Sequence, residues 1–358
     1  MSGVRLESVT VGLDWRAAFA NAYVRVSGFS TTIVRLRPDP ESGLEGIGEA
    51  APSMLGRESA RTVAADYASL SGSGLLRDVR ADDPETWAPV LRALSGRPAA
   101  LAGVETALLD LSAKEAGLPL WRWWGLSGTG PTRTFFTIPM VGGAELEHWI
   151  GLGTELGATR LKVKVGNPGA EPRSAAADRL RRTRAGFPQA PIRVDANAAW
   201  ELEDAADFAG ELLRWEVGSL EEPLAEGASV QDFADLRALT GLPVFADEFC
   251  TSPRALARAA DRYDGVVLKT QNWGGLGRTR RAIETARRNG LAVCLGCNAE
   301  TSVSIGASAQ LASLADDLDL DSALLIHEDP FMASGIEGTE ILPGSAPGIG
   351  AREAGAPR

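Results

Sequence analysis

Short apolar runs recur from Thr134 onward, and each is followed by a stretch whose apolar positions have helical spacing. The runs are FFTIPMVG, RLKVKVG, IRVDANA, GSLEEP, PVFADEF, GVVLKTQ, LAVCLGCN and LDLDSALLI. Runs of this length that are rich in β-branched residues and bounded by turn residues are typical of buried strands. Eight such strands alternating with helices predict an α/β fold, a (β/α)7β TIM-like barrel.

The chain before this barrel has a different pattern. SVTVGL, STTIVRLRP and GLEGIGEAAP predict strands, and residues 98–117 carry apolar positions at helical spacing with a Gly at the end. After the last barrel strand the chain becomes rich in Gly and Pro. We therefore predict an α+β capping domain over residues 1–130, the barrel over 131–325, and a C-terminal segment, 326–358, that returns to the capping domain.

Composition excludes several classes of function. A net charge of −11 leaves no basic stripe for nucleic acid. No apolar run reaches the roughly 18 residues of a membrane span. The first residues, MSGVRLESVTVG, lack the basic and then apolar layout of a signal peptide. We expect a cytoplasmic protein without a nucleic-acid or membrane partner, and the composition leaves a homo-oligomer open.

Cysteine and histidine offer little chemistry. The three cysteines are too few for a disulfide framework. Cys294 and Cys297 form a CxxC on a predicted strand, where residues three apart point to opposite faces, so we expect small buried side chains rather than a redox pair. The two histidines, His148 and His327, are too few for a zinc site or a His-based triad.

The lysines are more informative. Of 36 Lys and Arg residues only four are lysines, and Lys114 lies in a helical pattern that suits a surface residue or an ion pair. Lys162, Lys164 and Lys269 lie inside apolar strand-like runs, where lysine is least expected. Because Lys can release its proton in a protein and Arg cannot, these three positions suggest proton transfer.

Charged residues also stand at the ends of consecutive predicted strands, where a barrel of this kind has its active site. In order along strands two to six they are Lys162 and Lys164, Asp195, Glu221 or Glu222, Asp247, and Lys269. Three converging carboxylates would raise one another's pKa, and a hard divalent cation with oxygen ligands, Mg²⁺, resolves this conflict. Any one of these residues alone would suit an ion pair, but their combined order predicts a metal site flanked by lysines.

With these motifs the chain resembles the enolase superfamily and, within it, the muconate-lactonizing-enzyme subgroup. LKVKVG is similar to the KxK motif, VDANAAW, LEEP and FADEF to the three metal-ligand strands, and VVLKTQNWGG to the second-lysine strand. GCNAETSVSIGASAQLA is similar to the seventh strand and its helix. GIGEAAP and ALAGVETALLDLSAKEAGLPLWRWWG are similar to the capping domain, so the resemblance covers nearly the whole chain.

The resemblance implies a role for each charged residue. Asp195, Glu221 and Asp247 would be the Mg²⁺ ligands, Lys164 and Lys269 the acid/base pair, and Lys162 an electrostatic helper near the carboxylate of a small-molecule substrate. Mg²⁺ bound to that carboxylate stabilises the enediolate formed when the neighbouring carbon loses its proton. Two lysines on opposite faces of that carbon can take and return a proton, which is the chemistry of a racemase or epimerase.

Three further features bear on the substrate. Asp319 and Asp321 lie two apart on the predicted eighth strand and resemble the Asp-x-Asp that binds the substrate ammonium in dipeptide epimerases, although Ser322 and Ala323 stand where those enzymes usually show Ala-Pro. An acidic loop is the alternative interpretation. We expect Glu300 to bond the substrate and the stretch 15–29, with Phe19 and Tyr23, to form a specificity lid.

The first hypothesis is therefore a racemase or epimerase of an amino-acid derivative such as a dipeptide. The second is β-elimination or cycloisomerisation with a single lysine base, as in o-succinylbenzoate synthase or muconate cycloisomerase. The third is a barrel without catalysis, and the intact set of lysines and carboxylates counts against it.

Overall fold

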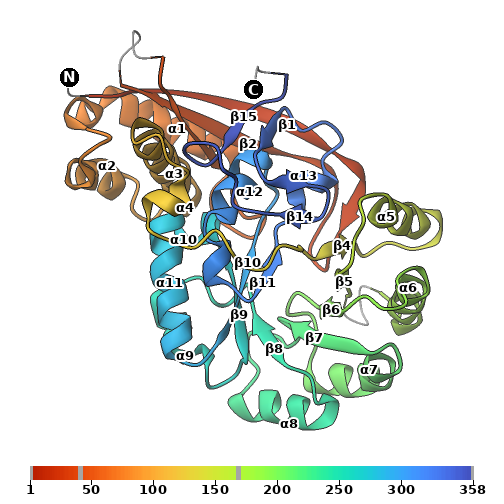
Figure 1. Cartoon of the computed structure of the whole chain (residues 1–358). Helices are drawn as coiled ribbons and strands as arrows, with labels where there is room; N and C mark the ends of the chain where they lie inside the picture. Colours follow the sequence, from red (N-terminus) through yellow and green to blue (C-terminus); the bar gives the residue numbers. More distant parts are fainter. Residues whose placement is uncertain (1–2, 39–42, 167–170, 356–358) are drawn as a thin grey trace.

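The computed structural model describes residues 3–38, 43–166 and 171–355, and Figure 1 shows a barrel with a second layer of strands and helices above it. The barrel sheet has eight parallel strands that neighbour one another in chain order. They are β4 (Phe136–Ile138), β5 (Leu161–Lys164), β6 (Ile192–Asp195), β7 (Val217–Glu221), β8 (Val244–Ala246), β9 (Gly265–Lys269), β10 (Ala292–Gly296) and β11 (Asp317–Asp319). A parallel bridge between Thr134 and Leu318 joins the first strand to the last, so the predicted barrel is confirmed.

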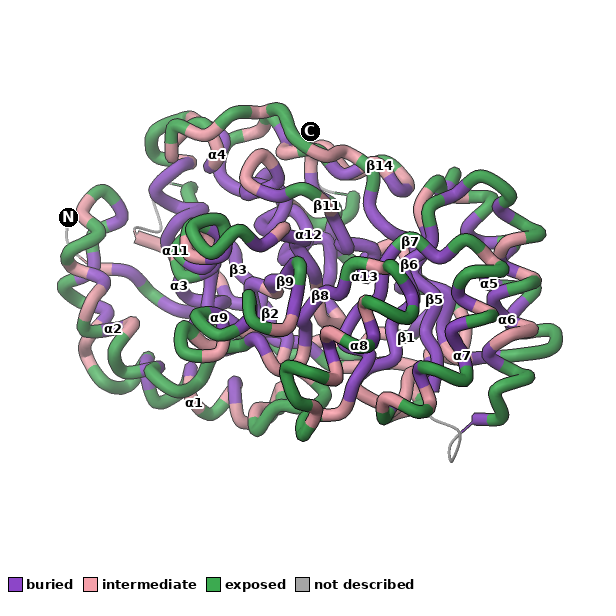
Figure 2. The backbone as a smooth tube through the Cα atoms, turned by 90° about the horizontal axis from the view of Figure 1, so that it is seen from below, coloured by how far each residue is buried: buried purple, intermediate pink, exposed green. Residues whose placement is uncertain are grey.

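Helices surround the barrel because each buries one apolar side against the strands. They are α5 (Gly143–Glu155), α6 (Arg173–Gly186), α7 (Leu202–Arg214), α8 (Val230–Thr240), α9 (Pro253–Ala259), α10 (Thr270–Trp273), α11 (Leu276–Arg288), α12 (Ser302–Ala309), the 3-10 turn Ala312–Leu314 and α13 (Ser322–Leu325). In Figure 2 the barrel strands are almost wholly buried, whereas α5, α6 and α7 alternate between buried and exposed positions. Local sequence also marks the ends, since α8 begins with a Ser229–Asp232 capping box and ends at Gly241.

The capping region is built on an antiparallel sheet of β1 (Arg5–Ala20), β2 (Arg25–Arg37) and β3 (Gly46–Ala50). Its helical elements are α1 (Ala60–Gly72), Leu75–Asp78, Pro84–Trp87, α2 (Ala88–Ala93), α3 (Pro98–Glu115) and α4 (Leu120–Trp123). Helix α3 is buried along nearly its whole length and packs closely on β3. A Cβ at Gly48 would lie 2.0 Å from the carbonyl oxygen of Gly103, so this close approach requires glycine.

The C-terminal segment lies beside the capping sheet (Figure 1), through β12 (Phe331–Ala333), β13 (Ile336–Glu337), β14 (Glu340–Ile341) and β15 (Ala351–Glu353). Asp110 of α3 ties it down by accepting hydrogen bonds from the backbone N–H groups of Ile349 and Ile47, each at 2.8 Å. Lys114 forms an ion pair with Asp110 at 2.6 Å, as predicted. The exact domain limits 1–130, 131–325 and 326–358 remain a prediction.

One local expectation is wrong. The eighth strand ends at Asp319, and Asp321 lies beyond it at the N-terminus of α13, because the chain turns into a helix directly after the strand. The predicted lid, residues 15–29, is formed by the ends of β1 and β2 and by the turn between them at residues 21–24. No helix in the described part of the chain is long and apolar enough to cross a membrane.

Candidate active site

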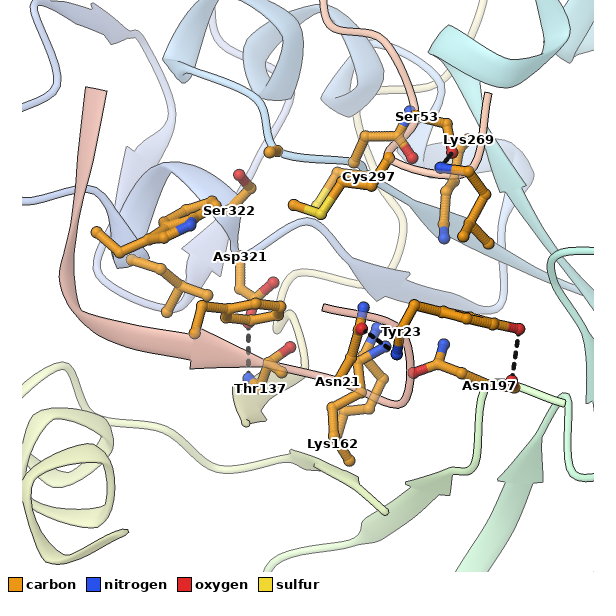
Figure 3. A pocket seen from close by; sticks show the side chains of 18 residues that line it. Asn21, Tyr23, Ser53, Thr137, Lys162, Asn197, Lys269, Cys297, Asp321 and Ser322 are labelled. Atoms are coloured by element: carbon orange, nitrogen blue, oxygen red, sulfur yellow. Dashed lines mark hydrogen bonds between the residues drawn. The ribbon is translucent and has the colours of Figure 1, made fainter. Parts of the chain in front are cut away.

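A pocket that is open to solvent lies at the C-terminal ends of the barrel strands and beneath the turn between β1 and β2 (Figure 3), and the empty space of about 760 Å³ within it includes part of that solvent. The barrel supplies all three strand lysines to its wall. The residues that line the pocket include Trp15, Phe19, Tyr23, Met54, Leu55, Lys162, Lys164, Asn197, Lys269, Asp321, Ser322 and Leu325. The predicted lid segment and the predicted catalytic lysines therefore line one cavity.

The sheet register explains why these side chains meet. Lys164 pairs with Asp195 across β5 and β6, and Asp195 pairs with Glu221 across β6 and β7. On the other side of the barrel, Gly296 of β10 pairs with both Lys269 and Asp319. Because parallel strands in register end at the same level, all these residues stand at one mouth of the barrel.

Each lysine is held by a carboxylate. Lys164 binds Asp195 and Lys162 binds Asp319, both through buried ion pairs, and Lys162 Nζ also lies 3.5 Å from Glu221. Lys269 Nζ lies 2.5 Å from Asp247. Burial alone would lower the pKa values of Lys162 and Lys269, but the neighbouring carboxylates raise both well above their ordinary value. In these ion pairs Lys162 and Lys269 keep their protons, so Lys269 can accept a proton only once its ion pair with Asp247 is broken.

Glu221 and Glu222 differ in what their oxygens contact. Both oxygens of Glu222 accept hydrogen bonds, from the backbone N–H groups of Asp247 and Phe249 and from the Tyr263 hydroxyl. Burial raises the pKa of Glu222 to about 7. Glu221 is completely buried, yet neither of its oxygens has a hydrogen-bond partner. The member of the pair with unsatisfied oxygens is therefore Glu221.

The charges around Glu221 keep it ionised. Burial would raise its pKa, but Lys162 and Arg193 lower it below the usual range. Asp195 behaves differently, because burial raises its pKa to about 6 in spite of Lys164. Two carboxylates on neighbouring strands thus have opposite shifts in pKa.

The predicted metal ligands do not form a closed cage. In the part of the chain that the structure describes, no group of three His, Cys, Asp or Glu side chains is arranged to hold a metal ion. Two of the predicted ligands, Asp195 and Asp247, are instead ion-paired to Lys164 and Lys269. The donor set nevertheless suits a hard cation. It consists of carboxylate oxygens on consecutive strand ends, and those of Glu221 are buried without hydrogen bonds.

The backbone after Asp195 bends sharply. Asn197 and Ala198 have φ values of 46° and 57°, in the left-handed region, and Asn197 N–H donates to Asp195 Oδ1 at 2.8 Å. The Asn197 side chain donates to Glu248 at 2.7 Å, and the Asn197 backbone carbonyl accepts a hydrogen bond from the Tyr23 hydroxyl at 2.6 Å (Figure 3). Asn197 therefore connects the lid to the strand that carries Asp195.

Asp321 lines the pocket, and Asp319 does not; both are buried, although only Asp319 is on a strand. Asp321 Oδ2 accepts a hydrogen bond from Thr137 N–H at 2.6 Å, while Asp319 Oδ1 has no partner. Burial raises the pKa of Asp321 to about 6. Asp321 therefore places a carboxylate in the pocket wall, and Asp319 lies buried behind it with one oxygen free of hydrogen bonds.

Glu300 lies behind the pocket wall rather than in it. The side chain is completely buried, one oxygen accepts from Asn298 N–H at 2.6 Å, and the other has no partner. Burial raises its pKa to about 8. Ser322 joins this loop to α13, because its hydroxyl accepts from Glu300 N–H and donates to the Glu300 carbonyl. The unexpected Ser322 thus has a clear structural role.

The lid is anchored at several points. Trp15 stacks on Phe29 and Phe19, with ring centroids 4.6 Å and 5.5 Å apart, and bridges to Ile326 beyond the barrel. The Ala20 carbonyl accepts a hydrogen bond from Met140 N–H at 2.7 Å. Trp15, Phe19 and Leu325 form an apolar wall, and Met54 and Leu55 supply further apolar surface.

The two barrel cysteines have different surroundings, because Cys294 is on β10 and Cys297 lies just beyond its end. Cys294 is buried in the barrel with Phe245 and Val267, whereas Cys297 follows β10 and lines the pocket. Both are free thiols. Cys297 is only half-buried, so the expectation of two buried side chains is right for Cys294 alone.

Sequence reasoning missed Arg193, which is buried inside the barrel. The period of two that places Lys162 and Lys164 on one face of a strand applies equally to Arg193 and Asp195. The pattern was therefore present in IRVDANA. Tyr263, which bonds Glu222, had no such pattern because it lies in the loop before β9.

A (β/α) barrel with an α+β cap, three lysines and a row of carboxylates at the strand ends defines an enzyme of the enolase superfamily, an isomerase or lyase. Residues 8–125 match the family model for the N-terminal domain of mandelate racemase / muconate lactonizing enzyme, and residues 151–352 match the enolase C-terminal domain-like model. The chain belongs to the mandelate racemase / muconate lactonizing enzyme family.

Known relatives lie within the same family. The chain is 36% identical over 314 residues to the hydrophobic dipeptide epimerase of Roseobacter litoralis, covering 87% of this chain and 88% of that protein. Its fold is similar to a substrate-liganded L-Ala-D/L-Glu epimerase from Bacillus subtilis (TM-score 0.87, 23% identity, 99% and 100% of the two chains). It is also similar to a dipeptide epimerase from Cytophaga hutchinsonii complexed with Mg and D-Ala-L-Val (TM-score 0.85, 22% identity, 99% and 97%).

Proposed function

We propose that this enzyme epimerises dipeptides with apolar side chains, inverting the α-carbon of the C-terminal residue in a Mg²⁺-dependent reaction. The observation that carries the proposal is that Lys164 and Lys269 line one pocket from strands four apart, with the carboxylate of Asp321 in the same pocket wall. The similarity to a hydrophobic dipeptide epimerase over most of the chain supports the substrate class.

Asp195, Glu221 and Asp247 would hold the metal ion. When bound, Mg²⁺ supplies a Lewis acid that stabilises the negative charge developing on the substrate carboxylate. The all-oxygen donor set and the unsatisfied oxygens of Glu221 support this assignment, as does the Mg in the Cytophaga hutchinsonii structure. Lys162, buried between Glu221 and Asp319, adds a fixed positive charge beside the same carboxylate.

The lysines would do the proton transfer. One of Lys164 and Lys269, once deprotonated, takes the α-hydrogen as a proton from one face, and the C–H electron pair passes into the enediolate. The other lysine, as an ammonium group, delivers a proton to the opposite face of the same carbon. A new C–H bond of inverted configuration forms, and the two lysines have exchanged protonation states.

The remaining contacts would select a dipeptide. Asp319 and Asp321 would bind the free ammonium group, since charge-assisted hydrogen bonds are strong in a buried site. Trp15, Phe19 and Leu325 would contact one apolar side chain, and Met54 and Leu55 lie on the cap side of the same pocket. Glu300 remains a candidate to bond the substrate through its unpartnered oxygen.

The test is incubation with Mg²⁺ in D₂O of three separate pools: apolar dipeptides, N-succinyl amino acids and hydroxy acids. We expect α-deuteration and inversion in the dipeptide pool. A product of changed mass without inversion would instead identify elimination or cycloisomerisation with one base. Absence of exchange in every pool would contradict an epimerase of these substrates.

The metal assignment has its own matched pair of variants. Glu221→Gln should abolish Mg²⁺ binding measured by titration calorimetry, because it removes a ligand charge. Glu222→Gln should bind Mg²⁺ with an affinity within a few-fold of the parent's, because both oxygens of Glu222 already accept hydrogen bonds from other protein groups. Equal losses in both variants would contradict the choice of Glu221.

A further inference from the structure

Arg193 is a buried cation on the floor of the barrel, below the proposed reaction site. It lies on β6 two residues before Asp195, with an exposed fraction of 1%. Its guanidinium carbon lies 4.5 Å from the ring centre of Phe135 and 4.2 Å from that of Phe245. The guanidinium therefore contacts one aromatic ring directly before β4 and another on β8, which lie two strands to either side of β6.

Each nitrogen of the Arg193 guanidinium faces a different polar side chain. Its Nε donates to the Ser219 hydroxyl at 3.1 Å, and Nη2 donates to Asp317 at 3.2 Å. Nη1 lies 3.5 Å from Glu221 Oε2 and has no hydrogen-bond partner. The remaining free donor of a fixed guanidinium thus faces the buried carboxylate whose oxygens are unsatisfied.

Two cations, Lys162 and Arg193, lie within 4 Å of Glu221, and Lys162 is shared with another carboxylate. Lys162 lies 3.5 Å from Glu221 but makes its closer ion pair with Asp319. Lys162 also lines the substrate pocket, so a bound ligand can engage it. Arg193 is beyond the reach of the pocket and remains opposite Glu221 whatever the lysines do.

We propose that Arg193 is a positioning residue that holds the carboxylate of Glu221 in the orientation that a ligand of the metal ion needs. The inference rests on the proposed function, in which Glu221 is a metal ligand. A guanidinium suits this role better than an ammonium group, because it is planar, stacks on aromatic rings and does not exchange its proton. The positive charge of Arg193 beside Glu221 therefore stays the same when the lysines above it gain or lose protons.

The chain provides a matched control in Arg160. Its guanidinium also lies 4.5 Å from the Phe135 ring centre, and it pairs with the same Asp317. Among the described carboxylates, its ion pair is with Asp317 and not with Glu221. Replacing Arg160 therefore removes a similar stacked cation and leaves the contact with Glu221 intact.

The experiment compares Arg193→Met and Arg160→Met by titration calorimetry with Mg²⁺ alone. We expect Arg193→Met to weaken Mg²⁺ binding by about 10- to 100-fold, as loss of a residue that orients a ligand does, and Arg160→Met to change it less than threefold. The kcat of Arg193→Met should recover toward the parent value as Mg²⁺ is raised, which a purely structural defect would not allow. Parental Mg²⁺ affinity in folded Arg193→Met would overturn the inference.

Arg193→Lys keeps the inference testable if Arg193→Met does not fold. Lysine preserves the charge but not the planar stack, so Mg²⁺ binding should weaken by about tenfold. Unchanged affinity in folded Arg193→Lys would overturn the claim that the stacked guanidinium positions Glu221. Glu221→Gln measured in parallel separates the two proposals, since unchanged Mg²⁺ affinity in that variant would instead contradict the metal site itself.

Discussion

Lys164 and Lys269 end strands four apart in an eight-stranded barrel, and each is ion-paired to a different carboxylate, Asp195 and Asp247. Strands four apart in such a barrel stand on opposite sides of its mouth. A carbon atom between the two ammonium groups would therefore present one face to each lysine. Both carboxylates are proposed metal ligands, so metal binding and release of the two lysines are linked.

Removing the acidic side chains of the pocket should weaken recognition of the ammonium group. A hydrogen bond to a charged group contributes about 1.5–3 kcal/mol. Asp321→Asn should therefore lower kcat/KM for dipeptides with a free amino group by about 10- to 100-fold. The matched substrate is an N-acetylated dipeptide, which lacks the positive charge. An equal loss for both substrates would show that Asp321 acts on the barrel through Thr137 and not on the ammonium group.

The lid should close less tightly without the Tyr23 hydroxyl. That hydroxyl donates to the Asn197 carbonyl at 2.6 Å, and a neutral hydrogen bond contributes about 0.5–1.5 kcal/mol. We expect Tyr23→Phe to raise KM by about two- to tenfold with little change in kcat. Steady-state kinetics with one dipeptide measure both constants. A fall in kcat at unchanged KM would contradict a role in closure and point to a role at the reacting atoms.

Glu105 should make stability depend on pH at the junction of cap and barrel. It is buried in α3, accepts a hydrogen bond from Gly277 N–H at 3.1 Å, and burial raises its pKa from 4.5 to about 7. Between those values the folded state binds more protons than the unfolded state, so this group's contribution to stability falls as pH rises through this range, by about 3 kcal/mol in all.

Glu105→Gln removes that titration. Relative to the parent, the variant should gain about 2–3 kcal/mol in free energy of unfolding between pH 5 and pH 8. Urea unfolding of both proteins at the two pH values measures the difference, and the other buried carboxyl groups cancel in the comparison. A difference between variant and parent that is the same at pH 5 and pH 8 would show that Glu105 does not titrate in this range.

The sequence predicts the barrel well because its strands are short apolar runs at regular intervals, and burial on both faces makes such runs easy to recognise. It places Lys164, Asp195 and Glu221 at one mouth because parallel strands in register end together. It does not place Asp321, since a two-residue period holds only while the strand continues. It also cannot show that Ser322 bonds Glu300 or that Tyr23 reaches Asn197, because those contacts join segments 22 and 174 residues apart.

The most direct test is exchange of the α-hydrogen in D₂O by the parent and by Lys164→Arg and Lys269→Arg, starting from each epimer of one dipeptide. Arginine keeps the charge but cannot accept the proton. The parent should deuterate both epimers and interconvert them. Each variant should lose epimerisation by about 10²–10⁴-fold and still exchange the hydrogen of one epimer only, a different one in each variant. Epimerisation at a near-parental rate in either variant would contradict the two-lysine account.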